Sequence, residues 1–478
     1  MIKNILLTLF CVALLAGCAQ VLNEPLPATP PDNESFPSDS TYDDAVGLYV
    51  STAGSDTAGD GTIGNPYRTV QHAVNLAPAG SIIVLRTGTY NESVDIRTPL
   101  TIRSKNDEWA VIQTPTTDDT ITETIRFNID TGWTSGGAKL YRLELVGGYY
   151  YAVKFETMWD WGGADRSGVS NVTIEACKIH DTGRDCVKIT PNCDDIRVVN
   201  CEIYNSGVRD NSNAEAIDNV NGDRAIVADC VIHDIATNGL YFKGGATDCV
   251  AERNYIYNCG GGGIGLGYDT SPEFFDLTAN PEYFENINGI VRNNVIYNTQ
   301  YFGIGMYAAK NPRVLNNTIV NAAQTAHSPI YFGISFQDWD AAAGRPACEG
   351  AIIKNNIAVS ASPDSYGVFI RYTGDLGGLN AYSGMPAMDH NRYYKPGGGS
   401  LVFVDQRPAG SFNGDLAGWK SHLSGETNST EGDPTLDSTY HLNSGSPCVD
   451  AGETLSQVVY DIDKQTRSGL YDIGADER

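Results

Sequence analysis

The sequence has few basic residues and, after its N-terminus, no long apolar segment. Its 478 residues include 32 Lys and Arg against 58 Asp and Glu, a formal net charge of −26. This charge repels phosphate backbones and anionic membrane surfaces, so we expect no nucleic-acid partner. No later segment reaches the roughly 18 apolar residues that a membrane-spanning helix needs. The composition therefore favours a folded acidic protein with a buried core.

The sequence is also poor in helix-favouring residues and in zinc-binding spacings. It has 5 Met but 51 Gly, 26 Tyr and 14 Phe, which favours strands and turns and excludes a helix bundle. Its 11 Cys are spread over a long chain, unlike the dense disulfide framework of a small secreted domain. No Cys pair and no Cys/His cluster has zinc-finger spacing.

The first 18 residues are predicted to be a targeting segment. Lys3 supplies the positive charge, residues 5–15 the apolar core, and Leu15-Ala-Gly-Cys18 the end. This tetrapeptide resembles the bacterial lipobox, which implies that Cys18 becomes the lipidated first residue of a protein anchored in the bacterial cell envelope, at the outer membrane or cell surface. The alternative is an ordinary cleaved secretory peptide with an incidental Cys18. Residues 19–45, rich in Pro and Ser, are predicted to form a flexible linker.

A short segment recurs along the chain. Its seven third positions are Cys177, Cys201, Cys230, Asn254, Asn294, Asn317 and Asn356. The basic step is 23 to 24 residues, with three longer steps, and each copy is followed by a turn and a second short strand. No stretch is long enough for a βαβ unit. The repeat therefore predicts an all-β fold, a parallel β-solenoid with coils about 4.8 Å apart.

The third positions are predicted to line the interior of the solenoid as a ladder. Asn side-chain amides at identical positions of stacked coils can bond to one another. The three Cys are interpreted most simply as small buried residues, and one strained disulfide among them is the alternative.

Two further segments carry a family resemblance. The N-terminal part contains Tyr49-Val-Ser-Thr-Ala-Gly-Ser-Asp56 and Asn65-Pro-Tyr-Arg-Thr-Val-Gln-His-Ala73, and the C-terminal part contains Asp450-Ala-Gly452 and Asp472-Ile-Gly-Ala475. With the repeat, they resemble the pectate-lyase-like superfamily, which implies a right-handed parallel β-helix. We expect the β-helix over about 46–395 and a C-terminal capping segment over 396–478, with a short helix at 415–423 shielding the open end.

One outward-facing column of the second strand is the predicted place of a site. Its members are Lys154, Lys188, Asp218, Tyr241, Gly265 and Gly305. Insertions at 207–214, 268–287 and 337–349 enter or leave this strand. Insertions gathered on one face of a solenoid commonly build its binding site.

The coil with the first insertion is rich in oxygen ligands. Asp210, Glu215 and Asp218 are predicted to bind Ca²⁺, because hard cations take six to eight oxygens. The alternative is a solvated acidic loop on an acidic protein.

Two lysines are candidate catalytic bases. Lys243 and Lys188 each lie about one coil from Asp218. β-Elimination of a uronic-acid polysaccharide needs a cation to acidify C5–H, a base to remove that proton, and a donor to the leaving oxygen. A Lys in a short Gly-flanked strand beside an acidic coil is similar to the family 9 pectate lyases and chondroitinase-B-like alginate lyases, which implies a Lys base with Ca²⁺. The alternative is a surface ion pair such as Lys188 with Asp218.

Other side chains are candidates for catalysis or sugar binding. His233 is a further possible catalytic residue, although His180, Tyr204, His233, Tyr257 and Tyr297 are predicted to form a stacked outward column. Arg209, Tyr241, Trp159, Trp161 and Trp339 are predicted to bind substrate, since flat aromatic faces suit sugar rings. Each loop Trp has the alternative of covering its own local core.

These patterns favour a surface-anchored, monomeric polysaccharide lyase whose partner is an acidic polysaccharide. A glycoside hydrolase on the same fold, for which Asp194-Asp195 is the adjacent carboxylate pair, is one alternative. A non-catalytic glycan-binding or adhesive protein is the other, and the break in repetition over residues 207–287 favours an enzyme.

Overall fold

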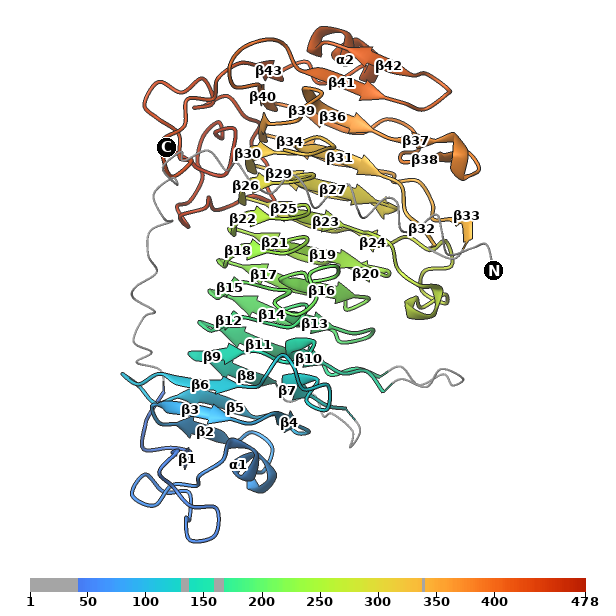
Figure 1. Cartoon of the computed structure of the whole chain (residues 1–478). Helices are drawn as coiled ribbons and strands as arrows, with labels where there is room; N and C mark the ends of the chain where they lie inside the picture. The colour runs from blue at the N-terminus through green and yellow to red at the C-terminus, as the bar shows by residue number, and fades with distance from the viewer. Residues whose placement is uncertain (1–41, 130–136, 159–166, 338–339) are drawn as a thin grey trace.

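The computed structural model describes residues 42–129, 137–158, 167–337 and 340–478. In this part of the chain the backbone winds through three long sheets of 12 strands each. The coils stack in chain order from one end of the molecule to the other (Figure 1). The chain is an all-β protein with the architecture of a right-handed parallel β-helix, as the repeat and the resemblance predicted.

The three sheets each take one strand from every coil. The first contains β1 (Leu48–Val50), β2 (Ile82–Leu85), β5 (Thr101–Ser104), β8 (Ala138–Tyr141), β11 (Val172–Glu175), β14 (Arg197–Val199), β17 (Ile226–Ala228), β21 (Val250–Glu252), β25 (Ile290–Arg292), β29 (Arg313–Leu315), β34 (Ile352–Lys354) and β39 (Ala387–Asp389). The second contains β4 (Val94–Ile96), β7 (Glu123–Phe127), β10 (Tyr151–Phe155), β13 (Val187–Ile189), β16 (Ile217–Val220), β19 (Leu240–Lys243), β23 (Ile264–Leu266), β27 (Ile304–Tyr307), β31 (Ile330–Gly333), β36 (Tyr366–Ile370), β41 (Val402–Asp405) and the antiparallel β42 (Phe412–Gly414). The third contains β3 (Gly88–Asn91), β6 (Ala110–Gln113), β9 (Leu143–Val146), β12 (Lys178–His180), β15 (Glu202–Tyr204), β18 (Val231–Ile235), β22 (Tyr255–Cys259), β26 (Val295–Thr299), β30 (Thr318–Ala322), β35 (Ile357–Ser360), β40 (Arg392–Tyr394) and β43 (Thr430–Glu431).

The remaining elements are short. Three small sheets contain β20 (Ala246–Thr247), β24 (Asn286–Ile287) and β28 (Ala309–Lys310); β32 (Phe336–Gln337) and β33 (Asp340–Gly344); and β37 (Tyr372–Thr373) and β38 (Leu379–Asn380). The helices are α1 (Val70–Leu76), α2 (Leu416–Leu423) and the 3-10 turns η2 (Pro272–Phe274) and η3 (Gly374–Leu376). No helix in the described ranges is long and apolar enough to cross a membrane.

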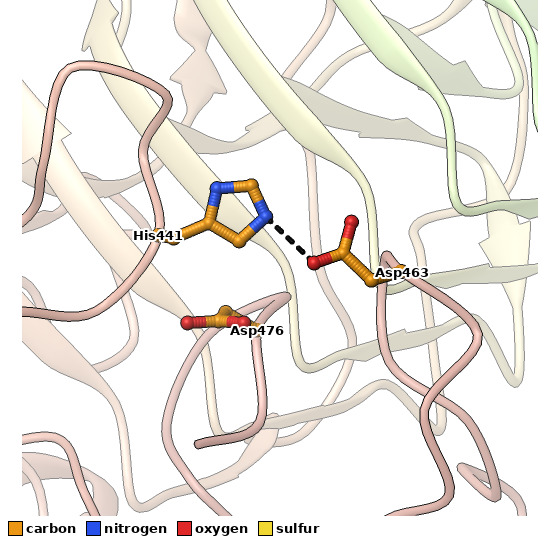
Figure 2. A group of neighbouring side chains, drawn as sticks. All are labelled: His441, Asp463 and Asp476. Atoms are coloured by element: carbon orange, nitrogen blue, oxygen red, sulfur yellow. Dashed lines mark hydrogen bonds and ion pairs between the residues drawn. The ribbon is translucent and has the colours of Figure 1, made fainter. Parts of the chain in front are cut away.

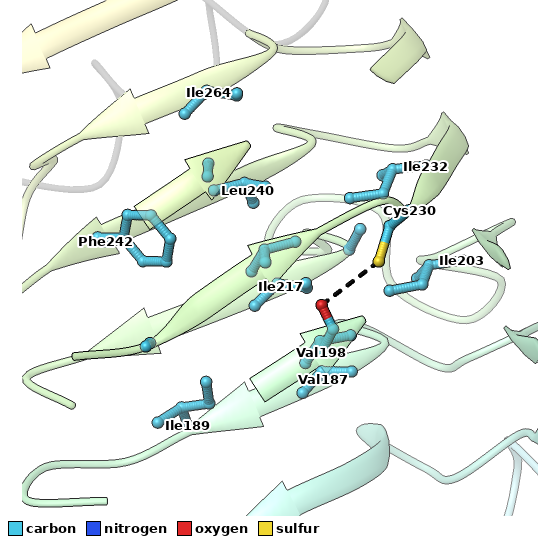
Figure 3. Packing of buried hydrophobic residues seen from close by; sticks show 14 of the residues in the cluster. Val187, Ile189, Val198, Ile203, Ile217, Cys230, Ile232, Leu240, Phe242 and Ile264 are labelled. Atoms are coloured by element: carbon cyan, nitrogen blue, oxygen red, sulfur yellow. Dashed lines mark hydrogen bonds between the residues drawn. The ribbon is translucent and has the colours of Figure 1, made fainter. Parts of the chain in front are cut away.

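The interior is filled by apolar columns. In the second sheet, register places the fully buried Val187, Ile217, Leu240, Ile264 and Ile304 above one another, as the period of two predicted. Figure 3 shows several of these side chains converging with those of the other sheets. Stacking identical positions lets each coil bury its apolar face against two neighbours.

A ladder of Asn amides runs beside the apolar columns. Asn254 Nδ2 donates to Asn294 Oδ1 at 2.9 Å, and the chain of bonds continues to Asn317, Asn356 and Asn391. The predicted ladder is confirmed, and Asn391 extends it by one coil. Cys177, Cys201 and Cys230 continue it toward the N-terminus as buried thiols, and all nine cysteines of the described chain are buried and unpaired.

The third sheet carries the predicted aromatic column on its outer face. His180, Tyr204, His233, Tyr257 and Tyr297 stack in sequence, with ring centroids 4.5 to 5.0 Å apart. The planes differ by only 4 to 9° because strand register holds the rings parallel.

Helices cover both ends of the solenoid. At the N-terminal end α1 buries Val70, Ala73 and Val74. At the other end the predicted helix is present as α2, where the Asp415 side chain accepts from Gly418 N–H and Trp419 is fully buried. The β-helix extends beyond residue 395, where the sequence predicted it to end, because β41 still pairs in parallel with β36 and β43 with β40. No local pattern in the sequence predicted β41 and β43.

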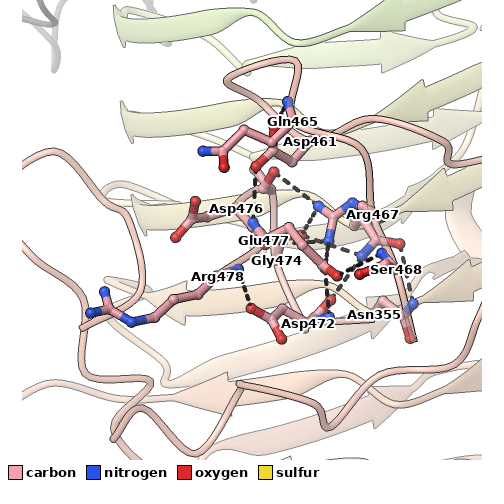
Figure 4. A network of polar contacts seen from close by, with 12 residues as sticks. Asn355, Asp461, Gln465, Arg467, Ser468, Asp472, Gly474, Asp476, Glu477 and Arg478 are labelled. Atoms are coloured by element: carbon pink, nitrogen blue, oxygen red, sulfur yellow. Dashed lines mark hydrogen bonds and ion pairs between the residues drawn. The ribbon is translucent and has the colours of Figure 1, made fainter. Parts of the chain in front are cut away.

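The rest of the C-terminal segment lies along the side of the coils (Figure 4). Arg467 Nη2 donates to Asn293 Oδ1, while Asn316 Nδ2 and Asn355 Nδ2 donate to the backbone oxygens of Asp472 and Glu453. These three Asn have left-handed backbone conformations, with φ of 53 to 57°, which Asn tolerates better than most residues. In each Asn-Asn pair, the first residue therefore holds the C-terminal segment and the second builds the internal ladder.

We predict that Asn317→Ala lowers the free energy of unfolding by about 3 kcal/mol, because it leaves buried amide groups of neighbouring coils without partners. Chemical denaturation followed by circular dichroism would measure the change. Thr325→Ala, at an exposed position after β30 in the same coil, serves as the control and should change stability by less than about 0.5 kcal/mol. Equal effects in both variants would contradict a role of the ladder.

Candidate functional site

A single outward column of the second sheet connects all its coils. Register pairs Asp95, Arg126, Lys154, Lys188, Asp218, Tyr241, Gly265, Gly305, Tyr331, Phe369 and Val404 in this order. The predicted column from Lys154 to Gly305 is confirmed. From Asp95 to Asp218 every member is charged, and from Tyr241 to Val404 none is.

At the boundary between the two halves lie three buried carboxyl groups. Asp185 precedes β13, Glu215 precedes β16, and Asp218 is in β16. They are 0 to 3% exposed, and one oxygen from each lies within 4.8 Å of the others. Each also has one buried oxygen without a hydrogen-bond partner: Asp185 Oδ2, Glu215 Oε2 and Asp218 Oδ1. Three converging, unsatisfied carboxylate oxygens are costly in a protein interior unless a charge or proton compensates them.

Two lysines lie on the outer side of this carboxylate group. Lys188 Nζ forms an ion pair with Asp218 Oδ2, and Lys243 Nζ lies 3.7 Å from Asp218 Oδ1. Lys243 Nζ also donates to Tyr241 Oη at 3.0 Å. The lysine side chains are 17% and 11% exposed while Asp218 is 1% exposed, so solvent reaches the amines before the carboxylates.

The close packing separates the protonation states of the carboxyl groups. Burial, with the charges of Glu215 and Asp218, raises the pKa of Asp185 well above its ordinary value. Burial also opposes ionisation of Asp218, but Lys188 and Lys243 outweigh it and lower the pKa of that carboxyl. Burial opposes the charge of Lys188, yet Asp218 and Asp185 raise the pKa of its amine. Lys188 is therefore an ammonium ion at neutral pH.

Arginine and tyrosine side chains border the group. The Arg209 guanidinium lies 3.9 Å from the Tyr149 ring centre, and its Nε donates to the Tyr149 carbonyl at 2.9 Å. Arg209 Nη2 is buried without a hydrogen-bond partner. Asp210, in contrast, accepts from Ser212 and lies 3.4 Å from Arg184 Nε, so the structure does not bring it to the other two predicted ligands.

The second and third insertions meet directly behind Lys243. Gly244, whose φ of 71° ends β19, donates its N–H to Glu285 Oε2 at 2.9 Å. Glu285 is fully buried and accepts from Arg345 Nε at 3.2 Å and from Thr270 Oγ1. One ion pair thus fastens residues from both insertions to the end of the strand that carries Lys243.

Several predicted residues lie elsewhere. His233 belongs to the aromatic column of the third sheet, where Asp234 and Glu202 are its charged partners. Arg224 bridges Asp194 and Asp195 on the surface. Trp159, Trp161 and Trp339 lie outside the described residues.

The sequence reasoning missed Asp185, Glu285 and Arg345. Asp185 had a visible signal, since it lies three residues before Lys188 just as Glu215 lies three before Asp218. Glu285 and Arg345 lie in the non-repeating insertions, and no pattern relates them.

A second group of possible ligands lies in the C-terminal segment: His441, Asp463 and Asp476 (Figure 2). His441 Nε2 pairs with Asp463 Oδ2 at 3.0 Å, and its Nδ1 lies 2.8 Å from Thr439 Oγ1. Asp476 Oδ2 accepts from Leu442 N–H. The hydrogen bonds and ion pairs of these three side chains with the protein explain why they lie together.

The carboxylate group beside the lysines fits a hard cation. Its donors are all oxygens, they come from two adjacent coils, and the three that lack partners belong to groups whose other atoms are held by the protein. Glu215 Oε1, for example, accepts from Thr237 Oγ1 at 2.7 Å, and Asp185 Oδ1 accepts from the Glu215 N–H at 3.1 Å. Ca²⁺ takes six to eight oxygen ligands, and Asp and Glu carboxylates are among those it binds.

Comparison with known proteins agrees with the fold. Residues 162–382 match the family described as right handed beta helix region, and residues 52–108 match a family described as a protein of unknown function, DUF1565. A 71-residue stretch is 41% identical to the uncharacterized protein YwoF of Bacillus subtilis strain 168, over 14% of this chain and 15% of that protein. The chain therefore matches only a small part of this curated relative.

Solved structures with similar folds include several enzymes. The complex of XylC with xylose has 11% identity and a TM-score of 0.50 over 90% of this chain and 98% of that chain. Pectate lyase Pel9A has 15% identity and a TM-score of 0.49 over 90% and 96%. The A-module of mannuronan C-5 epimerase AlgE4 from Azotobacter vinelandii has 14% identity and a TM-score of 0.49 over 68% and 88%. At such identities the likeness concerns the fold alone.

We predict that Ca²⁺ in excess raises the melting temperature of the wild-type protein and not that of Asp185→Asn. The replacement imitates the neutral carboxyl that burial favours, so without Ca²⁺ the variant should be at least as stable as the wild type. At about 100 times the dissociation constant, a bound ion stabilises the folded state by about 2.7 kcal/mol. Asp210→Asn is the matched control and should keep the Ca²⁺ response. A full response in Asp185→Asn would contradict the assignment of the ligands.

We also predict a pH-dependent contribution from the ion pair of His441. The Asp463 carboxylate raises the pKa of His441 to about 9, against the effect of burial. A histidine whose pKa is raised on folding contributes stability below its unfolded value of about 6.5 and loses it as pH rises through about 9. The melting-temperature difference between wild type and His441→Gln should therefore be constant from about pH 5 to 6.5, vanish above pH 9, and also decline at lower pH as the Asp463 carboxylate, whose pKa the His441 hydrogen bond lowers, takes up a proton. Asp463→Asn should reproduce this profile, and a difference that persists above pH 9 would refute it.

Proposed function

We propose that the protein is a polysaccharide lyase that cleaves a uronic-acid-containing polysaccharide by β-elimination, with Lys243 as base and Ca²⁺ as cofactor. The observation that carries the proposal is the convergence of three buried, partly unsatisfied carboxylates with two lysines on one outward column. Perturbed carboxyl groups with specific charge partners are typical of functional sites.

The carboxylate group is the evidence that favours Ca²⁺ as the cofactor. Asp185, Glu215 and Asp218 would hold the ion, and the remaining ligands would come from water or substrate. A Ca²⁺ ion at this place would neutralise a uronate carboxylate and acidify the proton on the adjacent C5. Asp210, which lies outside the group, does not take part in this proposal.

The contacts favour Lys243 over Lys188 as the base. Lys188 is bound tightly to Asp218 and its pKa is raised, so its amine keeps its proton. Lys243 lies farther from that carboxylate, and its amine is oriented by the Tyr241 hydroxyl. In the proposed step the C5 proton passes to Lys243 Nζ, the C5–H electron pair forms the C4–C5 double bond, the bond from C4 to the leaving oxygen breaks, and this oxygen takes a proton from solvent.

Positive side chains near Lys243 are proposed to bind the substrate. Arg209 is the proposed positive partner of a sugar carboxylate, and its stacking on Tyr149 holds the guanidinium in place. Lys188 remains a fixed positive charge that attracts an acidic polymer locally, against the negative charge of the whole protein. With a lipid anchor at Cys18 and the linker of residues 19–45, the monomeric enzyme would act at the surface of the bacterial cell envelope.

A hydrolase is less well supported by the geometry. Hydrolases hold their two carboxyl groups about 5 to 9.5 Å apart to admit a sugar or water. The three carboxyl groups here converge within 4.8 Å and lie beneath the lysines, and Asp194 and Asp195 pair with Arg224 instead.

The test is the ultraviolet absorbance of the unsaturated uronate that elimination produces. Polygalacturonate, alginate, chondroitin sulfate and ulvan would each be incubated with the purified protein, with Ca²⁺ and with EDTA. We expect a Ca²⁺-dependent rise on at least one polymer and a loss of about 10²- to 10⁴-fold in kcat for Lys243→Ala. Lys178→Ala, which removes an outward lysine paired with Glu202 on the third sheet, should retain full activity.

Other results would reject the proposal. New reducing ends without ultraviolet absorbance would indicate a hydrolase. No cleavage of any polymer would favour a glycan-binding protein, and full activity of Lys243→Ala would assign the base to another residue.

A further inference from the structure

The outer face of the second sheet changes character at the carboxylate group. Its N-terminal half is a ladder of charges, in which Lys154 contacts Glu123 and Glu156, and Arg126 contacts Glu123. Its C-terminal half has no charged residue in the same column as far as Val404. This column therefore changes from charged to uncharged residues at the carboxylate group.

The uncharged half is underlain by an aromatic row whose rings are largely buried and pack on one another. Tyr241 stacks on Tyr268 at 5.6 Å with planes 5° apart, and successive ring contacts continue through Tyr307 and Tyr331 to Phe369. In the same column a side chain at Gly265 would crowd Tyr241, and one at Gly305 would crowd the neighbouring ring of Phe302. Five strand steps separate Tyr241 from Val404, a distance of about 24 Å at about 4.8 Å per step.

The row ends in a cavity of about 470 Å³ between β36, β41 and β42. Its walls include the half-buried rings of Tyr366, Tyr372 and Phe412, with the exposed side chains of Gln406 and Asn413 at the rim. Flat rings combined with amide groups suit a sugar, because the rings cover its C–H face and the amides bond to its hydroxyls.

The rings of this cavity are held in place by their neighbours. Phe412 stacks on His422 of α2 at 5.1 Å and contacts Trp419, and Tyr366 packs edge-on against Phe369 at 4.9 Å. Rings fixed in advance lose little conformational entropy when a ligand binds.

The charge of the cavity selects its ligand. Its described lining contains no Lys, Arg or His, and its one carboxylate, Asp405, is already paired with Arg407 at 2.6 Å and with His422 at 2.9 Å. A uronate would find no positive partner here, whereas an uncharged sugar needs only the rings and amides.

We infer that this cavity is a distal subsite for uncharged sugar residues of the polysaccharide. For its relation to the point of cleavage, this inference rests on the proposed function. Together the two sites define the substrate as a mixed polymer in which uncharged sugars accompany uronates, and the protein binds it several residues beyond the cleaved bond.

The test measures binding separately from cleavage. Affinity electrophoresis would use native gels that contain galactan, arabinan, xyloglucan or xylan as uncharged polymers, or polygalacturonate as the uronate homopolymer. We expect retardation of the wild type and of Lys243→Ala by at least one uncharged polymer. Phe412→Leu, which keeps an apolar side chain against Trp419, and Tyr372→Ala should each weaken this retardation at least tenfold while leaving that by polygalacturonate unchanged. Tyr460→Ala removes an exposed Tyr ring elsewhere and is the matched control.

The outcomes separate the two proposals. Loss of retardation in the cavity variants supports the subsite even if no polymer is cleaved. Retardation that is equal in all variants, a loss confined to polygalacturonate, or no binding of any of the four uncharged polymers would overturn the inference while leaving the lyase assay unaffected. If both hold, Phe412→Leu should raise KM for a mixed polymer that the enzyme cleaves, with little change in kcat.

Discussion

The register between coils is the constraint on which the rest of the structure depends. Parallel backbone hydrogen bonds hold successive strands about 4.8 Å apart, so residues one coil apart in sequence become direct neighbours in space. Side chains of one kind can then stack in the interior: apolar ones at Val187 and Ile217, amides at Asn294 and Asn317. The same rule brings Lys188 against Asp218, although 30 residues separate them. A site on this fold is therefore built by side chains of consecutive coils, and a single changed residue alters its column only locally.

The carboxylate group differs from the polar groups elsewhere in the interior. The Asn ladder satisfies its amides within the protein, and Glu285 is buried to the same degree but surrounded by donors from Gly244, Thr270 and Arg345. Asp185, Glu215 and Asp218 each leave an oxygen without a hydrogen bond, and oxygens of all three lie within 4.8 Å of one another. Single buried atoms elsewhere, such as Glu426 Oε2, also lack a hydrogen bond, so the convergence of three carboxyl groups is the observation on which the proposed cation site rests.

The three insertions that interrupt the repeat lie beside the charged and uncharged halves of the outer face of the second sheet. The first insertion places Glu215 and Arg209 beside the charged half, and the second and third are joined through the ion pair of Glu285 and Arg345 directly behind β19. The ends of the solenoid are covered by α1 and α2, which prevents strand pairing with other molecules. Since α2 also supports the ring of Phe412, the element that protects the open end shapes the distal cavity as well.

The sequence by itself determined the coil step, the inward and outward columns, the amide ladder, the aromatic stack and α2. These features depend on a period of two within a strand and on a 23- to 24-residue repeat, both of which are local or periodic properties of the chain. Only the tertiary structure decided that Asp185 joins Glu215 and Asp218 and that Asp210 does not. The paths of the insertions brought Arg345 to Glu285, and two strands continued the β-helix beyond residue 395. Burial and pKa depend on what surrounds a side chain from every direction, and a linear pattern of residues contains no record of those surroundings.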